Sequence, residues 1–261
     1  MTVSRVQGSH QVRETMNEGS IRDRLAGVRE RMAAAAARGK HGAGGVTLVA
    51  VSKRKPVSAI VEAYEAGHRD FGENYGQELV TKAAELAHLE DLRWHYIGHL
   101  QTNKVKQLVR PSAGEGAQKA VALFHGVDRA KLIGELQKRA AAASQTVNVL
   151  VQVNIAGEDT KSGCQPAELA KLLDQVDAAD NLGLRGLMTM PPPVDDPEQA
   201  RGWFVQLRDL RAAHGGPDRL PELSMGMSQD YEVAIEEGAT IVRVGTAIFG
   251  VRDTPPAPGV R

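Results

Sequence analysis

Short apolar runs rich in β-branched residues alternate with helical stretches along this chain of 261 residues, and this alternation limits its fold most strongly. Such alternation favours parallel strands joined by right-handed crossovers. Eight strand–helix units make up a (β/α)8 TIM-type barrel, which we predict here. The alternative, a doubly wound sheet, would need a glycine-rich dinucleotide turn that the sequence lacks. The predicted strands cover residues 46–52, 70–72, 93–98, 121–127, 147–155, 184–190, 223–225 and 240–244.

One further helix is predicted before the first strand, over residues 18–38. Ile21, Leu25, Val28 and Met32 recur there at spacings of three and four, with charged residues between them. The other predicted helices begin at Pro56 and after Thr246, and cover 76–88, 103–109, 129–143, 166–179, 197–214 and 229–237. We expect one domain over 1–261, with disorder at 1–12, 111–119 and 254–261.

Composition narrows the class of protein. The 32 basic and 32 acidic residues balance, so no global field attracts nucleic acid or an anionic membrane. Cys164 is the only cysteine and cannot form an internal disulfide, which is typical of a reducing compartment. No apolar run has the length of a membrane helix, and the first residues lack the apolar core of a signal peptide. We therefore expect a cytoplasmic protein that binds neither nucleic acid nor membrane.

The active site of such a barrel lies where the strands end at their carboxyl side, so the strand exits carry the functional prediction. Strand alternation places Lys53 on the same face as Val49 and Val51. If that face points inward, Lys53 lies at the barrel mouth. A partly desolvated lysine there has a lowered pKa and condenses with an aldehyde. The alternatives are a solvated lysine at a strand end and a role for Lys55 as the reactive amine.

Two glycine-containing exits predict a phosphate site. They are the Ser224-Met225-Gly226-Met227-Ser228 segment after the seventh strand and Gly245-Thr246 after the eighth. Barrels often bind phosphate at these two loops, because glycine lets backbone amides approach and hydroxyls add donors. Ordinary turn chemistry is the alternative interpretation.

Charged and polar residues inside predicted strands need partners. Arg243 lies within an apolar strand and indicates either a ligand contact or a buried ion pair. In the fifth strand, valines at 147, 149, 151 and 153 face the helices, which turns Asn148, Gln152 and Asn154 inward. His95 and His99 lack acidic or thiol partners at metal-like spacing, so we predict no metal site. Cys164 has no nucleophile context.

Taken together, the strand exits resemble the YggS/PROSC family of pyridoxal phosphate homeostasis proteins. The matching segments are LVAVSKRKP (48–56), FGENYGQEL (71–79), WHYIGHLQTNKVK (94–106), VQVNIAGEDTKSGC (151–164), LRGLMTMPP (184–192), LSMGMSQDYEVAIEEGAT (223–240) and VRVGTAIFG (242–250). His99 departs from the proline or serine also familiar at its position. The resemblance implies a barrel like the N-terminal domain of alanine racemase.

The same resemblance implies a set of roles around pyridoxal 5'-phosphate (PLP). Lys53 would hold the cofactor as a Schiff base, and Asn74 would lie near its ring. The segment from Ser224 to Met227 and the Gly245-Thr246 turn would hold the phosphate. Arg243 would face the pyridine nitrogen and keep it unprotonated, which makes the ring a weak electron sink.

Three functions are compatible with these features. The first is a non-catalytic protein that stores, buffers or delivers PLP, as a monomer or weak homodimer, with PLP and PLP-dependent apoenzymes as partners. The second is an amino-acid racemase, which needs acid/base groups on both faces of the cofactor. The chain ends shortly after Gly250, so we expect no second domain to supply one. The third is a cofactor-free enzyme acting on a phosphate ester, with Glu73 as base. We predict the first.

Overall fold

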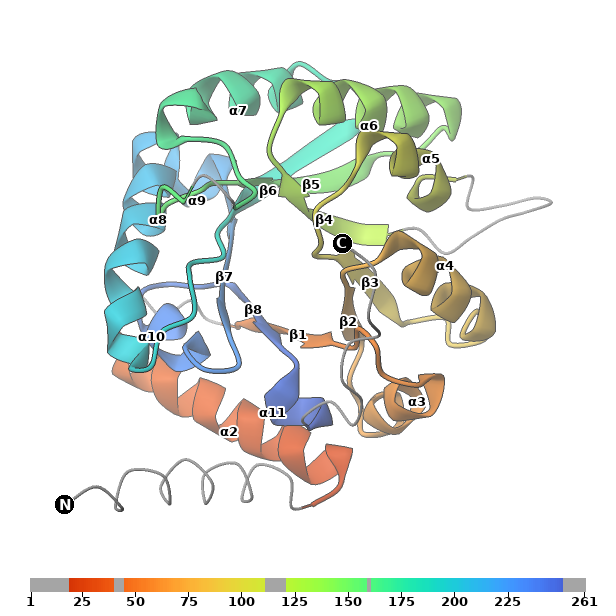
Figure 1. Cartoon of the computed structure of the whole chain (residues 1–261), viewed down its shortest axis with the longest axis vertical. Helices are drawn as coiled ribbons and strands as arrows, with labels where there is room; N and C mark the ends of the chain where they lie inside the picture. Colours follow the sequence, from red (N-terminus) through yellow and green to blue (C-terminus); the bar gives the residue numbers. More distant parts are fainter. Residues whose placement is uncertain (1–18, 40–44, 111–120, 159–160, 251–261) are drawn as a thin grey trace.

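Eight parallel strands close into one barrel in chain order, and β1 pairs with both β2 and β8 (Figure 1). The computed structural model describes residues 19–39, 45–110, 121–158 and 161–250; the disorder expected at 1–12, 111–119 and 254–261 lies outside them. The strands are β1 Thr47–Val51, β2 Asp70–Glu73, β3 Arg93–Tyr96, β4 Val121–Val127, β5 Val147–Gln152, β6 Leu182–Met188, β7 Glu222–Met227 and β8 Ile241–Val244. The predicted (β/α)8 barrel is confirmed.

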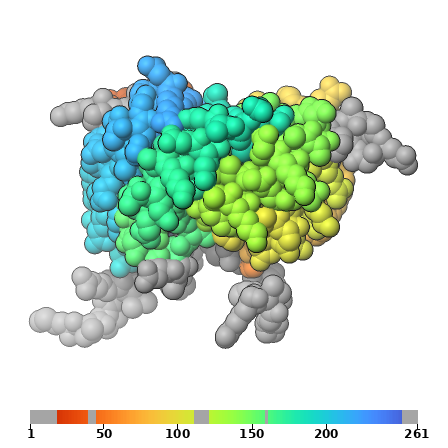
Figure 2. Space-filling view, turned by 90° about the horizontal axis from the view of Figure 1, so that it is seen from above, coloured from red at the N-terminus to blue at the C-terminus, as the bar shows by residue number. Residues whose placement is uncertain are grey.

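Helices follow each strand and surround the barrel in chain order, which the space-filling view shows on one side as yellow, green and blue segments (Figure 2). They are α3 Val57–Glu65, α4 Gly76–Glu85, α5 Val105–Leu108, α6 Ala130–Ala142, α7 Leu169–Asp177, α8 Arg201–Ala213, α9 Gly216–Arg219, α10 Tyr231–Glu236 and α11 Thr246–Phe249, with 3-10 turns at Thr102–Lys104, Pro166–Glu168 and Pro197–Ala200. In the described part of the chain, none of the helices is both long and apolar enough for a membrane crossing.

Helix α2, Ile21–Arg38, completes the ring of helices outside the barrel. The helix after β8 has only four residues, so α2 packs against α10, α11 and α3 beside it (Figure 1). Ser20 caps α2 in a reciprocal pair with Asp23, which explains why the helix begins three residues later than predicted. Arg24 Nε donates to Ile248 O at 2.6 Å, and this bond ties α2 to the last helix of the barrel.

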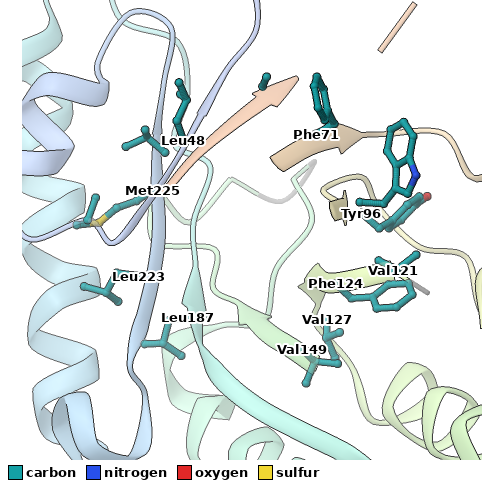
Figure 3. Close-up of a cluster of buried hydrophobic side chains, with 14 of the residues drawn as sticks. Leu48, Phe71, Tyr96, Val121, Phe124, Val127, Val149, Leu187, Leu223 and Met225 are labelled. Carbon is teal, nitrogen blue, oxygen red and sulfur yellow. The ribbon is translucent and has the colours of Figure 1, made fainter. Parts of the chain in front are cut away.

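Two separate apolar layers follow from the period of two along the strands. A small layer inside the barrel consists of Val49, Leu123, Leu150, Met188 and Ile241. The outward faces join the large core beneath the helices, where Leu48, Phe71, Val149, Leu187 and Leu223 lie (Figure 3). Val49 therefore points inward as expected, and so does the face that leads to Lys53.

Strand β5 follows the predicted alternation. Val149 and Val151 lie in the outer core, as expected. Gln152 and Asn154 are buried, and each donates its side-chain amide to a backbone carbonyl of the loop after β5, Ser162 O and Glu158 O. Asn148, at the other end of the strand, is exposed. The inward amides thus fix this loop against the barrel.

Gly98, at the exit of β3, allows the β2 and β3 exits to approach closely. A Cβ at this position would lie 2.1 Å from Asn74 O, closer than any real contact. The small residue therefore sets where Asn74 stands at the barrel mouth.

We expect Gly98→Ala to lower the free energy of unfolding by about 1–3 kcal/mol, because the added methyl group pushes two backbone segments apart. Gly134→Ala is the matched control, since it lies in α6 with open space around a Cβ and should stabilise by about 0.5–1 kcal/mol. Urea unfolding measures both. Equal midpoints for the two variants would contradict the close approach.

Candidate functional site

A cavity of about 290 Å³ opens at the carboxyl ends of the strands. Its wall combines the exits of β1, β2, β3, β7 and β8 with the loop after β6. The lining residues are Val51, Lys53, Asn74, Ile97, Met190, Pro193, Met227, Ser228, Gln229, Asp230, Arg243, Gly245 and Thr246. Six of the predicted site residues thus meet in one cavity: Lys53, Asn74, Met227, Arg243, Gly245 and Thr246.

The residue before Lys53 is held from behind by a buried charge cluster. Ser52 Oγ donates to Glu73 Oε1 at 2.6 Å, and Lys82 Nζ donates to the same oxygen at 2.7 Å. Lys82 also donates to Ser52 O at 2.8 Å. Burial raises the pKa of Glu73, against the opposing effect of Lys82. Glu73 therefore lies behind the strands, between β2 and α4, and not at the cavity where a base for phosphate-ester chemistry would have to stand.

The residue after Lys53 is held by the same cluster. Arg54 N donates to Glu78 Oε1 at 2.6 Å, and Lys82 Nζ contacts that oxygen at 2.7 Å. Arg54 has a left-handed backbone, with φ of 59°, and its guanidinium contacts Tyr75. A non-glycine residue adopts this conformation only where its surroundings hold it. We call Ser52, Glu73, Glu78 and Lys82 the lysine clamp, because they fix the backbone on both sides of Lys53.

Arg243 forms part of the cavity floor and is 4% exposed. Its guanidinium donates to Ser224 Oγ at 2.5 Å and to Thr189 O at 2.9 Å. Burial lowers its pKa to about 10, so it stays charged at neutral pH. Arg243 forms no ion pair with another described residue, so the structure does not support the alternative of a buried ion pair.

The Ser224–Met227 segment, expected as a turn after the seventh strand, instead forms the last four residues of β7. Its pairing with β8 shifts between Ser224 and Met227, and Gly226 has φ of 92° there. Such a bulge inserts one extra residue and re-aims the next side chain. Met227 thereby reaches the cavity. Ser224 lies inside the barrel below Arg243, Met225 packs in the outer core, and Gly226 contacts α10 closely; none of these three lines the cavity.

Hydroxyl groups gather where β7 and β8 end. Ser228 Oγ accepts the Gly245 amide at 3.0 Å, which joins the two exits, and the exposed Thr246 follows directly. Asp230 Oδ1 accepts the Met227 amide at 2.6 Å and closes the turn after β7. Burial raises the pKa of Asp230. Lys53, Arg243 and Asp230 give the cavity wall two basic groups and one acidic group.

Asn74 supplies a polar atom that has no hydrogen-bond partner among the described residues. Its Oδ1 is buried in the wall and forms no hydrogen bond. Such atoms usually have a partner in folded proteins, because an unpaired one costs about 1–3 kcal/mol. The side-chain amide therefore provides an unused contact for a polar ligand.

Other candidate side chains lie away from this cavity. His95 lies inside the barrel, bonded to Asp70 and His125, whereas His99 is exposed beside Ser162. The two histidines therefore share no ligand position. Cys164 is buried, and burial raises its pKa to about 12, so its thiol stays protonated.

A larger cavity, of about 530 Å³, lies at the opposite end of the barrel, between α2 and the starts of β1, β2 and β3. Two of its arginines are already paired: Arg69 with Asp91, and Arg93 with Asp70. The chemistry that the sequence predicts therefore converges on the smaller cavity at the strand exits.

Sequence reasoning missed several residues that build the site. In the sequence, Ser228 is only the end of the predicted phosphate segment, and neither Asp230 nor Lys82 has a predicted role. Helix periodicity could have shown Lys82 four residues after Glu78, on one face of α4. His125, which contacts Ser224 inside the barrel, gave a usable signal as a polar residue in an otherwise apolar strand.

These features define the class of protein as a barrel of the alanine racemase N-terminal type. The sequence profile of the family described as "Alanine racemase, N-terminal domain" matches residues 24–253. Solved racemases share the fold at low identity; alanine racemase of Corynebacterium glutamicum is 15% identical, with a TM-score of 0.56 over 89% of this chain and 63% of that one.

Sequence relatives narrow the class further. The pyridoxal phosphate homeostasis protein of Aquifex aeolicus is 44% identical over 88% of this chain and 97% of its own length. The protein of the same name from Pseudomonas aeruginosa is 45% identical over 90% and 96%. PipY of Synechococcus elongatus, solved with PLP bound, is 37% identical, with a TM-score of 0.75 over 88% of this chain and all of that one. The chain belongs to the family of pyridoxal phosphate homeostasis proteins.

We expect Lys82→Met to lower the free energy of unfolding by about 3–5 kcal/mol, because it leaves the buried Glu73 carboxylate without its cation. Lys131→Met, at an exposed position on α6, is the matched control and should change stability by less than about 0.5 kcal/mol. Urea unfolding with intrinsic tryptophan fluorescence gives both values. If the two variants unfold at the same urea concentration, the lysine clamp contributes nothing.

Proposed function

We propose that this protein binds pyridoxal 5'-phosphate in the cavity at the strand exits and takes part in intracellular homeostasis of that cofactor. The observation that carries the proposal is the meeting of an amine, a guanidinium and two hydroxyls in one cavity: Lys53, Arg243, Ser228 and Thr246. The cofactor supplies an aldehyde that condenses with an amine, with loss of water, to a Schiff base. Lys53 is the lysine in this wall, and we assign the attachment to it.

The residues present fit the chemical groups of the cofactor. The excess of one positive charge in the wall suits a phosphate dianion, and the hydroxyls of Ser228 and Thr246 are donors for its oxygens. Arg243 is a permanent donor that suits the pyridine nitrogen as an acceptor. The side-chain amide oxygen of Asn74 has no hydrogen-bond partner among the described residues and is available to a donor of the ligand. The phosphate contacts fall on the Ser228 and Thr246 hydroxyls beside Gly245, because Ser224 is already engaged by Arg243 and the Gly245 amide already donates to Ser228.

We further propose that the protein is a carrier or buffer of the cofactor and not a racemase. Racemisation needs a second acid/base group opposite the lysine. Tyr75, Tyr96 and His99 do not line the cavity, and burial raises the pKa of Tyr96 to about 12. Asp230 is the one described carboxylate in the wall, and it already accepts the Met227 amide. A charged Arg243 at the ring nitrogen would keep that nitrogen unprotonated and weaken carbanion stabilisation.

Borohydride reduction tests the attachment. The protein loaded with PLP should be yellow, and reduction should fix the cofactor on one peptide, the one that contains Lys53. Lys53→Ala should lose the reducible adduct, whereas Lys55→Ala, two residues away, should keep it. Peptide mapping by mass spectrometry identifies the labelled lysine. Labelling mainly on Lys55, or unchanged labelling of Lys53→Ala, would contradict the assignment.

Proton exchange tests the carrier role. Single L- and D-amino acids are incubated in deuterium oxide with the PLP-loaded protein, and the α-proton signal is followed by NMR. We expect exchange no faster than with free PLP at the same concentration, because Asp230, the one described carboxylate in the wall, is already engaged by the Met227 amide. Exchange at rates typical of enzymes, abolished by Lys53→Ala, would favour the racemase instead.

A further inference from the structure

Among the described residues, the buried charge of Arg243 has no carboxylate partner of the kind that such a group normally has. Its guanidinium contacts the Ser224 hydroxyl and the Thr189 carbonyl, and the Asp230 carboxylate acts on it only from a distance. A charge removed from water is costly unless hydrogen bonds or opposite charge compensate it. Of the two groups that accept from Arg243, only the Ser224 hydroxyl can also donate a hydrogen bond and so link the guanidinium to further side chains.

Ser224 is the first link of an unbroken row of side chains across the barrel interior. Ser224 Oγ lies 2.8 Å from His125 Nδ1, and His125 Nε2 lies 3.0 Å from His95 Nδ1. His95 Nε2 in turn lies 3.0 Å from Asp70 Oδ1. All four residues are at most 9% exposed. The row joins residues of β8, β7, β4, β3 and β2.

We propose that Arg243, Ser224, His125, His95 and Asp70 form a one-directional hydrogen-bond relay that positions the guanidinium in the cavity floor. Arg243 can only donate and the Asp70 carboxylate can only accept, so two neutral histidines satisfy every link in one way. Arg243 donates to Ser224, Ser224 to His125 Nδ1, His125 Nε2–H to His95 Nδ1, and His95 Nε2–H to Asp70. Each histidine carries its one proton on Nε2.

The pKa shifts of His125 and Asp70 agree with this assignment of protons. Burial, together with nearby His95 and Arg243, lowers the pKa of His125 well below its usual value, so its ring stays neutral. Burial alone would raise the pKa of Asp70, but hydrogen bonds from His95 and Arg93 hold it well below its usual range. Hydrogen bonds in such a row polarise one another, so the Asp70 charge strengthens the bond to Arg243.

The relay connects two openings of the barrel. Arg243 lines the cavity at the strand exits, whereas Asp70 and His95 line a third cavity, of about 200 Å³, at the strand starts. The charged groups that face His95 there are Asp70 and Arg93, with Arg185 and Glu222 across the same cavity. Ser224, His125, His95 and Asp70 are thus positioning residues, which act on a ligand only through Arg243.

Nitrogen-15 NMR of the full-length protein without cofactor tests the relay directly. Two-bond proton–nitrogen correlations distinguish Nε2–H from Nδ1–H, and His95→Gln and His125→Gln assign the two rings. We expect both rings to be neutral with the proton on Nε2. Asp70→Asn should move the Nε2 proton of His95 upfield and that of His125 less far in the same direction. Asp91→Asn, a carboxylate that pairs with Arg69 outside the relay, should move neither.

A second arm measures the effect on the cofactor and rests on the proposed function. Asp70→Asn and Ser224→Ala should each raise the Kd for PLP about fivefold, as expected for roughly one lost hydrogen bond, and Asp91→Asn should leave it unchanged. A proton on Nδ1 of either ring, or an unmoved His125 signal in Asp70→Asn, would overturn the relay whether or not PLP binds. Failure of the unmodified protein to bind PLP would overturn the proposed function and leave the NMR result standing. If Asp70→Asn does not fold, the NMR spectrum of Ser224→Ala still tests the relay. His125 Nδ1 loses its hydrogen-bond donor in that variant, so the His125 signals must change.

Discussion

Closure of the sheet between β1 and β8 is the constraint on which the rest of the structure depends. Thr47 to Ala50 pair in register with Ile241 to Val244, so the first and last strands end side by side. This pairing brings Lys53 and Gly245, separated by most of the chain, to one cavity. It also forces a single inward face, which must hold both an apolar layer and, above it, the charge of Arg243.

Two polar networks compensate the charges that this geometry buries. The lysine clamp lies outside the barrel, where Lys82 joins Ser52, Glu73 and Glu78 and fixes the backbone beside Lys53. The relay lies inside the barrel below Arg243. The clamp holds the backbone beside Lys53, and the relay holds the side chain of Arg243. A binding site for a small charged ligand requires rigid support of this kind.

The order of elements could be predicted from the sequence, because strand and helix periods alternate along the described part of the chain between Thr47 and Phe249. The face of Lys53 followed from the same period. Contacts across the sequence could not be predicted: the bulge that turns Met227 inward depends on how β7 pairs with β8, and Ser224 meets His125 only in the closed barrel. Helix periodicity pairs Lys82 with Glu78 on one face of α4, but it does not show that the neighbouring strands bury this lysine. Six of the nine expected residues thus line one cavity, whereas the networks that support them could not be predicted.

A crystal structure of the protein soaked with PLP tests the central claim most directly. The account predicts electron density continuous from Lys53 Nζ to the cofactor, with its phosphate beside Ser228, Gly245 and Thr246 and its ring nitrogen toward the Arg243 guanidinium. Density joined to a different lysine, or a phosphate seated in the arginine-lined cavity beneath α2 while the strand exits stay empty, would contradict the account.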